Sequence, residues 1–194
     1  SAVNTAFLRD GAFVQLSEGV ETDRVIHLVF LATGDDYPVV SHPRALVLAE
    51  PNSKLTLVES YVGLTEAAYF TNAVTEIVVE DGAQVEHYRY MREGQNAFHI
   101  GTTRVALGSD SIFDSVSFAR GSDLARNDLG VLLNKAGSTC RLSGLYQTSG
   151  NQHIDNHIDI DHASPHSSSD QYFKGILDGH SRGVFTGRVL VRPD

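Results

Sequence analysis

The clearest pattern in this chain is the alternation of apolar and polar residues over short segments. These segments are rich in Val, Leu, Ile, Phe, Tyr and Thr, and small polar turns such as Glu80-Asp81-Gly82 and Gly108-Ser109-Asp110 separate them. No long segment has apolar residues at helical spacing. The pattern predicts an all-β chain. The expected strands are Val25–Leu31, Ala45–Ala49, Leu55–Val62, Thr75–Val79, Val85–Met91, Thr103–Leu107, Ile112–Phe118, Val131–Asn134, Arg141–Gln147 and Gly187–Arg192.

The turns recur with a nearly constant period. Small residues that open one class of strand lie 30, 28, 27 and 29 residues apart, at Ser53, Ala83, Ser111, Ser138 and Ser167. A second class of strand lies about midway between them. Regular spacing of this kind is typical of stacked coils, so we predict a parallel β-solenoid with about 28 residues and two strands per coil. A β-sandwich is the alternative, because its turns also recur every 8–12 residues.

Residues in a strand point alternately to opposite faces. We therefore expect one set to face the packed interior of the solenoid: Leu55, Leu57, Ile112, Val116 and Phe118. Polar side chains should lie on the outer face: Thr56, Glu59, Glu86 and Arg89.

The segment from Gly150 to Gly187 has the densest mixture of histidine and acidic residues, and part of it alternates strictly. One side of an extended strand would carry Ile154, Asn156, Ile158, Ile160 and His162. The other side would carry His153, Asp155, His157, Asp159 and Asp161. This second stripe is the main candidate for chemistry in the chain.

Three histidines of the Gly150–Gly187 segment could form a metal site only around a turn. Residues four apart on a strand are ~13 Å from each other, so His153 and His157 cannot share a metal on one regular strand. His157, His162 and His166 flank an expected turn at 163–165, which makes them the candidate ligands for iron or zinc. The alternative is an exposed polar face of acids and imidazoles. We expect only weak metal binding, which becomes weaker still when the imidazoles are protonated below about pH 6.5.

Composition excludes several classes of function. The formal net charge of −9 argues against binding of a phosphate backbone, and no apolar run is long enough to cross a membrane. The chain has neither a phosphate-binding loop nor a dinucleotide-binding turn. The single cysteine, Cys140, fits a reducing compartment, and its place in a strand predicts a buried and inert thiol.

An enzymatic alternative remains open from the residues alone. Acids align along the faces of carbohydrate-active β-helix enzymes, and Asp155, Asp159 and Asp161 could serve a lyase or a glycosidase. Such an enzyme would need two carboxyl groups ~5–9.5 Å apart in a groove.

Several motifs in the last part of the chain resemble a known family. They are Gly150-Asn151-Gln152-His153-Ile154-Asp155-Asn156-His157, Asp161-His162-Ala163-Ser164-Pro165-His166, Phe173-Lys174-Gly175-Ile176-Leu177 and Gly183-Val184-Phe185-Thr186-Gly187. Together with Phe13-Val14-Gln15-Leu16 near the start, they resemble the core of the SufB/SufD family, the scaffold components of the SUF iron–sulfur cluster assembly system. The residues at 155–157 and 174–177 are more similar to those of the SufD branch than to those of the SufB branch.

This resemblance implies a right-handed parallel β-helix and a non-enzymatic scaffold that aids iron acquisition. It also implies pairing with a SufB-like paralogue and work with the SufC ATPase, which the family binds through a helical C-terminal domain. No tightly bound cofactor is expected, only transient iron or a transient cluster. The implied location is the cytoplasm, or the stroma in a plastid.

The family's best-known cluster-related residue is a histidine in a Cys-x-His-Gly motif, and residues 1–194 contain no Cys-x-His. We therefore expect residues 1–194 to be a single β-helix core domain that lacks both this motif and the helical domain. Exposed end coils also predict that a homodimer can form in place of the SufB pairing.

Overall fold

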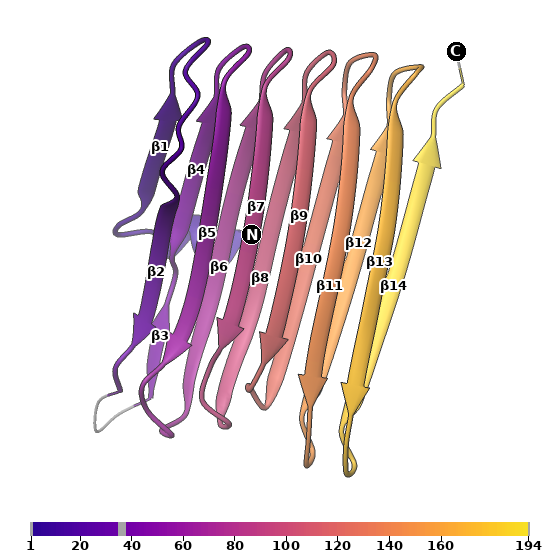
Figure 1. Ribbon diagram of the computed structural model, residues 1–194. Helices are drawn as coiled ribbons and strands as arrows, with labels where there is room; N and C mark the ends of the chain where they lie inside the picture. The colour runs from indigo at the N-terminus through magenta and orange to yellow at the C-terminus, as the bar shows by residue number, and fades with distance from the viewer. Residues whose placement is uncertain (1, 35–37, 194) are drawn as a thin grey trace.

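The computed structural model describes residues 2–34 and 38–193, and its strands lie in two facing parallel sheets (Figure 1). Within these residues one sheet has eight strands: β1 (Ala12–Leu16), β3 (Val39–Ser41), β4 (Arg44–Ala49), β6 (Tyr69–Val79), β8 (Ala97–Leu107), β10 (Leu124–Leu133), β12 (His153–His162) and β14 (Arg182–Val191). The other has six: β2 (Ile26–Ala32), β5 (Lys54–Gly63), β7 (Gln84–Arg92), β9 (Ile112–Arg120), β11 (Thr139–Thr148) and β13 (Ser168–Leu177).

The strands form a solenoid because each one pairs in parallel with the strand one coil later. The register advances by 29 residues where Asn127 of β10 pairs with Asn156 of β12. In Figure 1 the six-stranded sheet lies in front with its strands running down, and the other sheet runs up behind it as the chain advances to the right. The coil is therefore right-handed. The predicted all-β solenoid with two strands per coil is confirmed, and the sandwich alternative is wrong.

The core is built from ladders of like residues, because parallel register places the same coil position at the same height in every coil. One ladder in the eight-stranded sheet is aliphatic throughout: Val14, Val47, Ile77, Val105, Val131, Ile160 and Val189. Five of these seven, from Val47 to Ile160, are buried. Adjacent coils lie ~4.8 Å apart, so branched side chains contact directly along the axis of the solenoid.

The expected inward and outward faces are partly confirmed. Leu55 and Leu57 are fully buried, and Glu86 is exposed. In β9 the expected parity is wrong, because Phe113 is buried whereas Val116 is 46% exposed. The reason is register, since Phe113 pairs with Val85 on one side and with Cys140 on the other, both of which are buried core residues.

Glu59 and Arg89 also depart from expectation, because both are buried inside the solenoid instead of lying on its outer face. They share the parity of Leu57 and Val85, so the alternation of each strand carries them inward.

A short helix, α1 (Ala2–Phe7), precedes the first coil and was not expected from the periodicity. Its buried Asn4 donates through Nδ2 to the carbonyl oxygens of Pro43 and Asn72, which fixes the helix beside β6. Over residues 2–34 and 38–193, no helix has the length and hydropathy needed to cross a membrane.

The ladder arrangement predicts a large difference between two leucines. Leu55→Ala removes a fully buried side chain and should lower the free energy of unfolding by about 2–5 kcal/mol. Leu46→Ala is the matched control on the outer face, where 41% of the residue is exposed, and should cost less than about 1 kcal/mol. Urea unfolding measures both, and equal losses would contradict the assigned faces.

Candidate functional site

The predicted histidine and acid stripe lies along β12. Ile154, Asn156, Ile158 and Ile160 are buried, as expected, whereas the alternate positions are only half-buried on the outer side. The division into an inner and an outer stripe is therefore confirmed. The outer stripe belongs to the solvent-facing side of the eight-stranded sheet.

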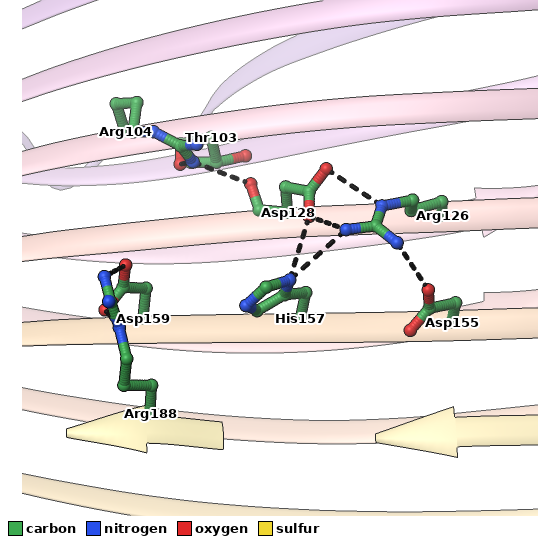
Figure 2. A network of polar contacts seen from close by, with 8 residues as sticks. All are labelled: Thr103, Arg104, Arg126, Asp128, Asp155, His157, Asp159 and Arg188. Carbon is green, nitrogen blue, oxygen red and sulfur yellow. Dashed lines mark hydrogen bonds and ion pairs between the residues drawn. The ribbon is translucent and has the colours of Figure 1, made fainter. Parts of the chain in front are cut away.

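Arg126 of β10 is the hub of the polar network on this outer face (Figure 2). Its Nη1 donates to Oδ2 of Asp155 over 2.7 Å, and its Nη2 donates to Oδ1 of Asp128 over 2.9 Å. Nη2 also lies 3.2 Å from Nδ1 of His157. Because a guanidinium can only donate, His157 accepts through Nδ1 and carries its hydrogen on Nε2.

The two remaining acids of the stripe each pair with an arginine one coil later. Asp159 accepts from Nε of Arg188 over 2.9 Å, and Asp161 accepts from Nε of Arg192 over 2.9 Å. The hydrogen bonds from these arginines hold the pKa of both carboxyl groups below the ordinary value. Neither group can therefore serve as the protonated general acid that glycoside hydrolysis requires.

The three histidines proposed as metal ligands are not brought together. His157 faces outward in mid-strand, whereas His162, five residues on and ~16 Å away, has Nδ1 and Nε2 each 2.9 Å from a serine hydroxyl, of Ser167 and Ser169. His166 lies in the turn after β12 with a positive φ of 58°. Among the described residues no cluster of three His, Cys, Asp or Glu side chains could hold a metal ion.

A second polar network lies inside the solenoid, and sequence reasoning missed it. Glu59 is fully buried and accepts hydrogen bonds from Nε2 of His87 over 2.9 Å and from the hydroxyl of Thr75 over 2.7 Å. The other ring nitrogen of His87 is 3.1 Å from the hydroxyl of Ser115. Burial alone would raise the pKa of Glu59. His87, together with Arg89 and Thr75, outweighs that effect and keeps this pKa below its ordinary value.

The same network continues through Arg89. Its Nη2 donates to Nε2 of the fully buried His99 over 2.8 Å, and Nδ1 of His99 lies 3.1 Å from Oε2 of Glu93. Burial lowers the pKa of His99 and favours the neutral imidazole, which this arrangement requires. Gly101 makes the close approach possible, because a Cβ atom there would lie 2.2 Å from Nη2 of Arg89.

The alternation of the strands carried a signal for this interior network. Glu59 has the parity of Leu55 and Leu57, and Arg89 has that of Val85 and Met91. The expected outward position of both followed from their polar side chains and not from their parity, and charged residues are indeed rarely buried without partners. The partners come from coils 16–28 residues away in sequence, such as Thr75 and His87 around Glu59, and no local pattern identifies them.

Cys140 is buried, as predicted, and stands in the apolar ladder beside Phe113. Burial raises the pKa of this thiol to about 12, so the thiol remains protonated and unreactive at neutral pH.

Comparison with known families identifies the class of protein. The model for the SUF system FeS cluster assembly, SufBD core domain, matches residues 30–194. The chain therefore belongs to the SufBD core domain family of the SUF iron–sulfur cluster assembly system.

Individual relatives agree with this assignment. The chain is 34% identical to an iron–sulfur cluster assembly SufBD family protein of Synechocystis, over 98% of this chain and 44% of the relative. It is 30% identical to the chloroplastic protein ABCI7 of Arabidopsis thaliana, over 98% of this chain and 42% of that protein. It is 27% identical to the iron–sulfur cluster assembly protein SufD of Escherichia coli, over 86% of this chain and 39% of that protein. The chain thus spans less than half the length of these relatives.

The buried Glu59 carboxylate predicts a pH-dependent stability. Because its folded pKa lies below the ordinary 4.5, its contribution is complete above about pH 4.5 and is lost as the pH falls through the folded value. Glu59→Gln leaves Arg89 without this counter-charge and should cost about 3–5 kcal/mol at pH 7. The difference in the free energy of unfolding between Glu59→Gln and the parent protein should become smaller at acidic pH.

Urea unfolding at a series of pH values measures this difference. Glu86→Gln, on the exposed side of β7, is the control and should change stability by less than about 0.5 kcal/mol at every pH. A Glu59→Gln penalty that stays constant from pH 7 into acid would refute the assigned ionisation.

Proposed function

We propose that this chain forms the solenoid core of a SufD-type scaffold, which supports iron–sulfur cluster assembly without catalysing a reaction itself. The match of the core-domain family to residues 30–194 carries this proposal. The parallel solenoid is consistent with it, because a rigid stack of coils can hold partner proteins in a fixed geometry.

Assignment to the SufD branch rests on finer features. The residues at 155–157 and 174–177 resemble those of SufD more closely than those of SufB, and the Escherichia coli relative is named SufD. The proposed partners are a SufB-like paralogue and the SufC ATPase, with a homodimer as a substitute pairing. SufC would bind through a helical domain outside residues 1–194. The proposed location is the cytoplasm or a plastid stroma, and one relative is named as chloroplastic.

The carbohydrate-active alternative has no support from the outer face of the solenoid. Asp155, Asp159 and Asp161 are each paired with an arginine side chain. A paired, ionised carboxylate can neither donate the proton to a leaving group nor act as an unhindered base. We therefore propose a scaffold and not an enzyme.

Iron or a nascent cluster would be the cargo of such a scaffold and not a resident cofactor. His157, His162 and His166 remain the candidate contacts for iron in this chain. Arg126 lies against one ring nitrogen of His157, and serine hydroxyls lie against both ring nitrogens of His162. These contacts compete with a metal ion, so any contact with iron should be transient.

Co-purification tests the scaffold proposal. The tagged protein, in a form that includes the helical SufC-binding domain, should be expressed with the SufB-type and SufC-type proteins of its own source and should retain both through affinity and size-exclusion steps. Omission of the SufB-type protein provides the control, because it should leave only the SufC-type partner or a homodimer. A stable complex of the SufB-type and SufC-type proteins that excludes this protein would contradict the proposal.

Metal titration tests the histidine assignment. We expect Fe²⁺ and Zn²⁺ to bind this protein no more tightly than about millimolar, because the three imidazoles are separated along β12 and its turn. Calorimetry of the parent and of His157→Ala measures this, and His153→Ala is the matched control on the same face. Micromolar or tighter binding that disappears only in His157→Ala would show a metal site.

A further inference from the structure

A small cavity lies between the two sheets in the middle of the solenoid. It has a volume of about 40 Å³, and inward-facing residues from both sheets line it. Its polar lining includes His87, Arg89, Thr103, Ser115, Asn127 and Asn156. A cavity with this lining differs from the apolar ladders around it.

Three side chains that line this cavity have polar atoms without a hydrogen-bond partner among the described residues. They are Nε of Arg89, Oδ1 of Asn127 and Nδ2 of Asn156, and each residue is at least nine-tenths buried. The two asparagines share one bond, from Nδ2 of Asn127 to Oδ1 of Asn156 over 3.2 Å. Reversal of both amides would again leave one donor and one acceptor without a partner.

Such polar atoms destabilise the folded protein unless a ligand forms hydrogen bonds with them. A buried polar atom that forms no hydrogen bond has lost its hydration without compensation, which destabilises the folded state, and the loss is greater for a cationic donor. The unmatched set contains two donors and one acceptor, so the occupant must both accept and donate hydrogen bonds.

The size of the cavity limits that occupant. A water molecule needs at least about 10–15 Å³ of such volume, so 40 Å³ accommodates roughly three. Molecules as large as a sugar, a nucleotide or an organic cofactor do not fit.

The local charge also limits the occupant. Arg89 is opposed by Glu59 and Glu93, and His99 is neutral, so the interior has no excess of positive charge to attract an anion. A metal ion would lie beside the Arg89 guanidinium, and the described residues provide no cluster of three ligands for it. A neutral dipolar molecule is the remaining class.

We propose that this cavity is a binding site for ordered water, which bridges Arg89, Asn127 and Asn156. The water joins the Glu59–His87–Ser115 chain to the asparagine pair. Through Arg89, His99 and Glu93 it also extends the polar path toward the open cavity of about 1070 Å³ at the first coils, which Glu93 and Thr71 line. The solenoid interior is thus partly hydrated. This site is independent of the proposed function.

Crystallography of the protein, at a resolution that shows ordered water, tests the site. We expect roughly three water peaks within hydrogen-bonding distance of Nε of Arg89 and of the two asparagine amides. Crystals soaked in bromide should show no anomalous peak there, and crystals pressurised with xenon should show no xenon. A bromide peak would instead assign an anion site, and an empty cavity that takes xenon would show a dry one. Either result would overturn the proposal.

A pair of variants tests which groups hold the water. Asn156→Leu removes one member of the asparagine pair and places an apolar side chain in the cavity, so at least one water peak should disappear. Asn134→Leu, an identical exchange at an exposed position after β10, should leave all of them in place. Water peaks unchanged by Asn156→Leu would contradict the assigned ligands.

Discussion

Every inward side chain of this solenoid must stack on the residues one coil before and one coil after it, because parallel pairing fixes the register between coils. The aliphatic ladder through Ile77, Val105 and Val131 shows the favourable result, in which branched side chains of similar size contact along the axis. A shift of one residue in such a stack would exchange the inner and outer faces of a strand. The remaining features of the molecule depend on this constraint.

The same constraint explains why polar residues gather in the interior. Once Glu59 lies inward, the neighbouring coil must offer it partners. Strand β7 does so with Arg89, which is in register with Glu59, and with His87, two residues before Arg89. A buried charge pair of this kind gives little net stability, because desolvation offsets most of the attraction. Its loss is nevertheless costly, since each group depends on the others. The polar layer therefore fixes which residues face each other more than it adds to the stability of the fold.

The fold could be predicted from the sequence, because the spacing of the turns and the two-residue alternation are both local signals. The faces of β9 could not, since Ile112, Phe113, Val116 and Phe118 are apolar on both parities and only the pairing of Phe113 with Cys140 selects one. The outer stripe of β12 was predicted correctly as a pattern, whereas the arginines that pair with its acids were not predicted. Arg126 and Arg188 neutralise its acids from neighbouring coils 29 residues away, a separation at which the sequence shows no sign of contact.

These pairings determine what the outer face can do. The carboxylates that would have suggested catalysis are paired with arginines, and His157 contacts Arg126, so these side chains on the outer face form a network of ion pairs and hydrogen bonds. A network of that kind suits a rigid support. Unmatched polar atoms that point to a ligand occur instead inside the solenoid, where Arg89 and the two asparagines meet. In this protein, as far as it is described, the acids that stand out in the sequence are already paired with arginines, whereas the polar atoms of Arg89 and the two asparagines that lack a partner lie in the interior, where no local pattern identifies them.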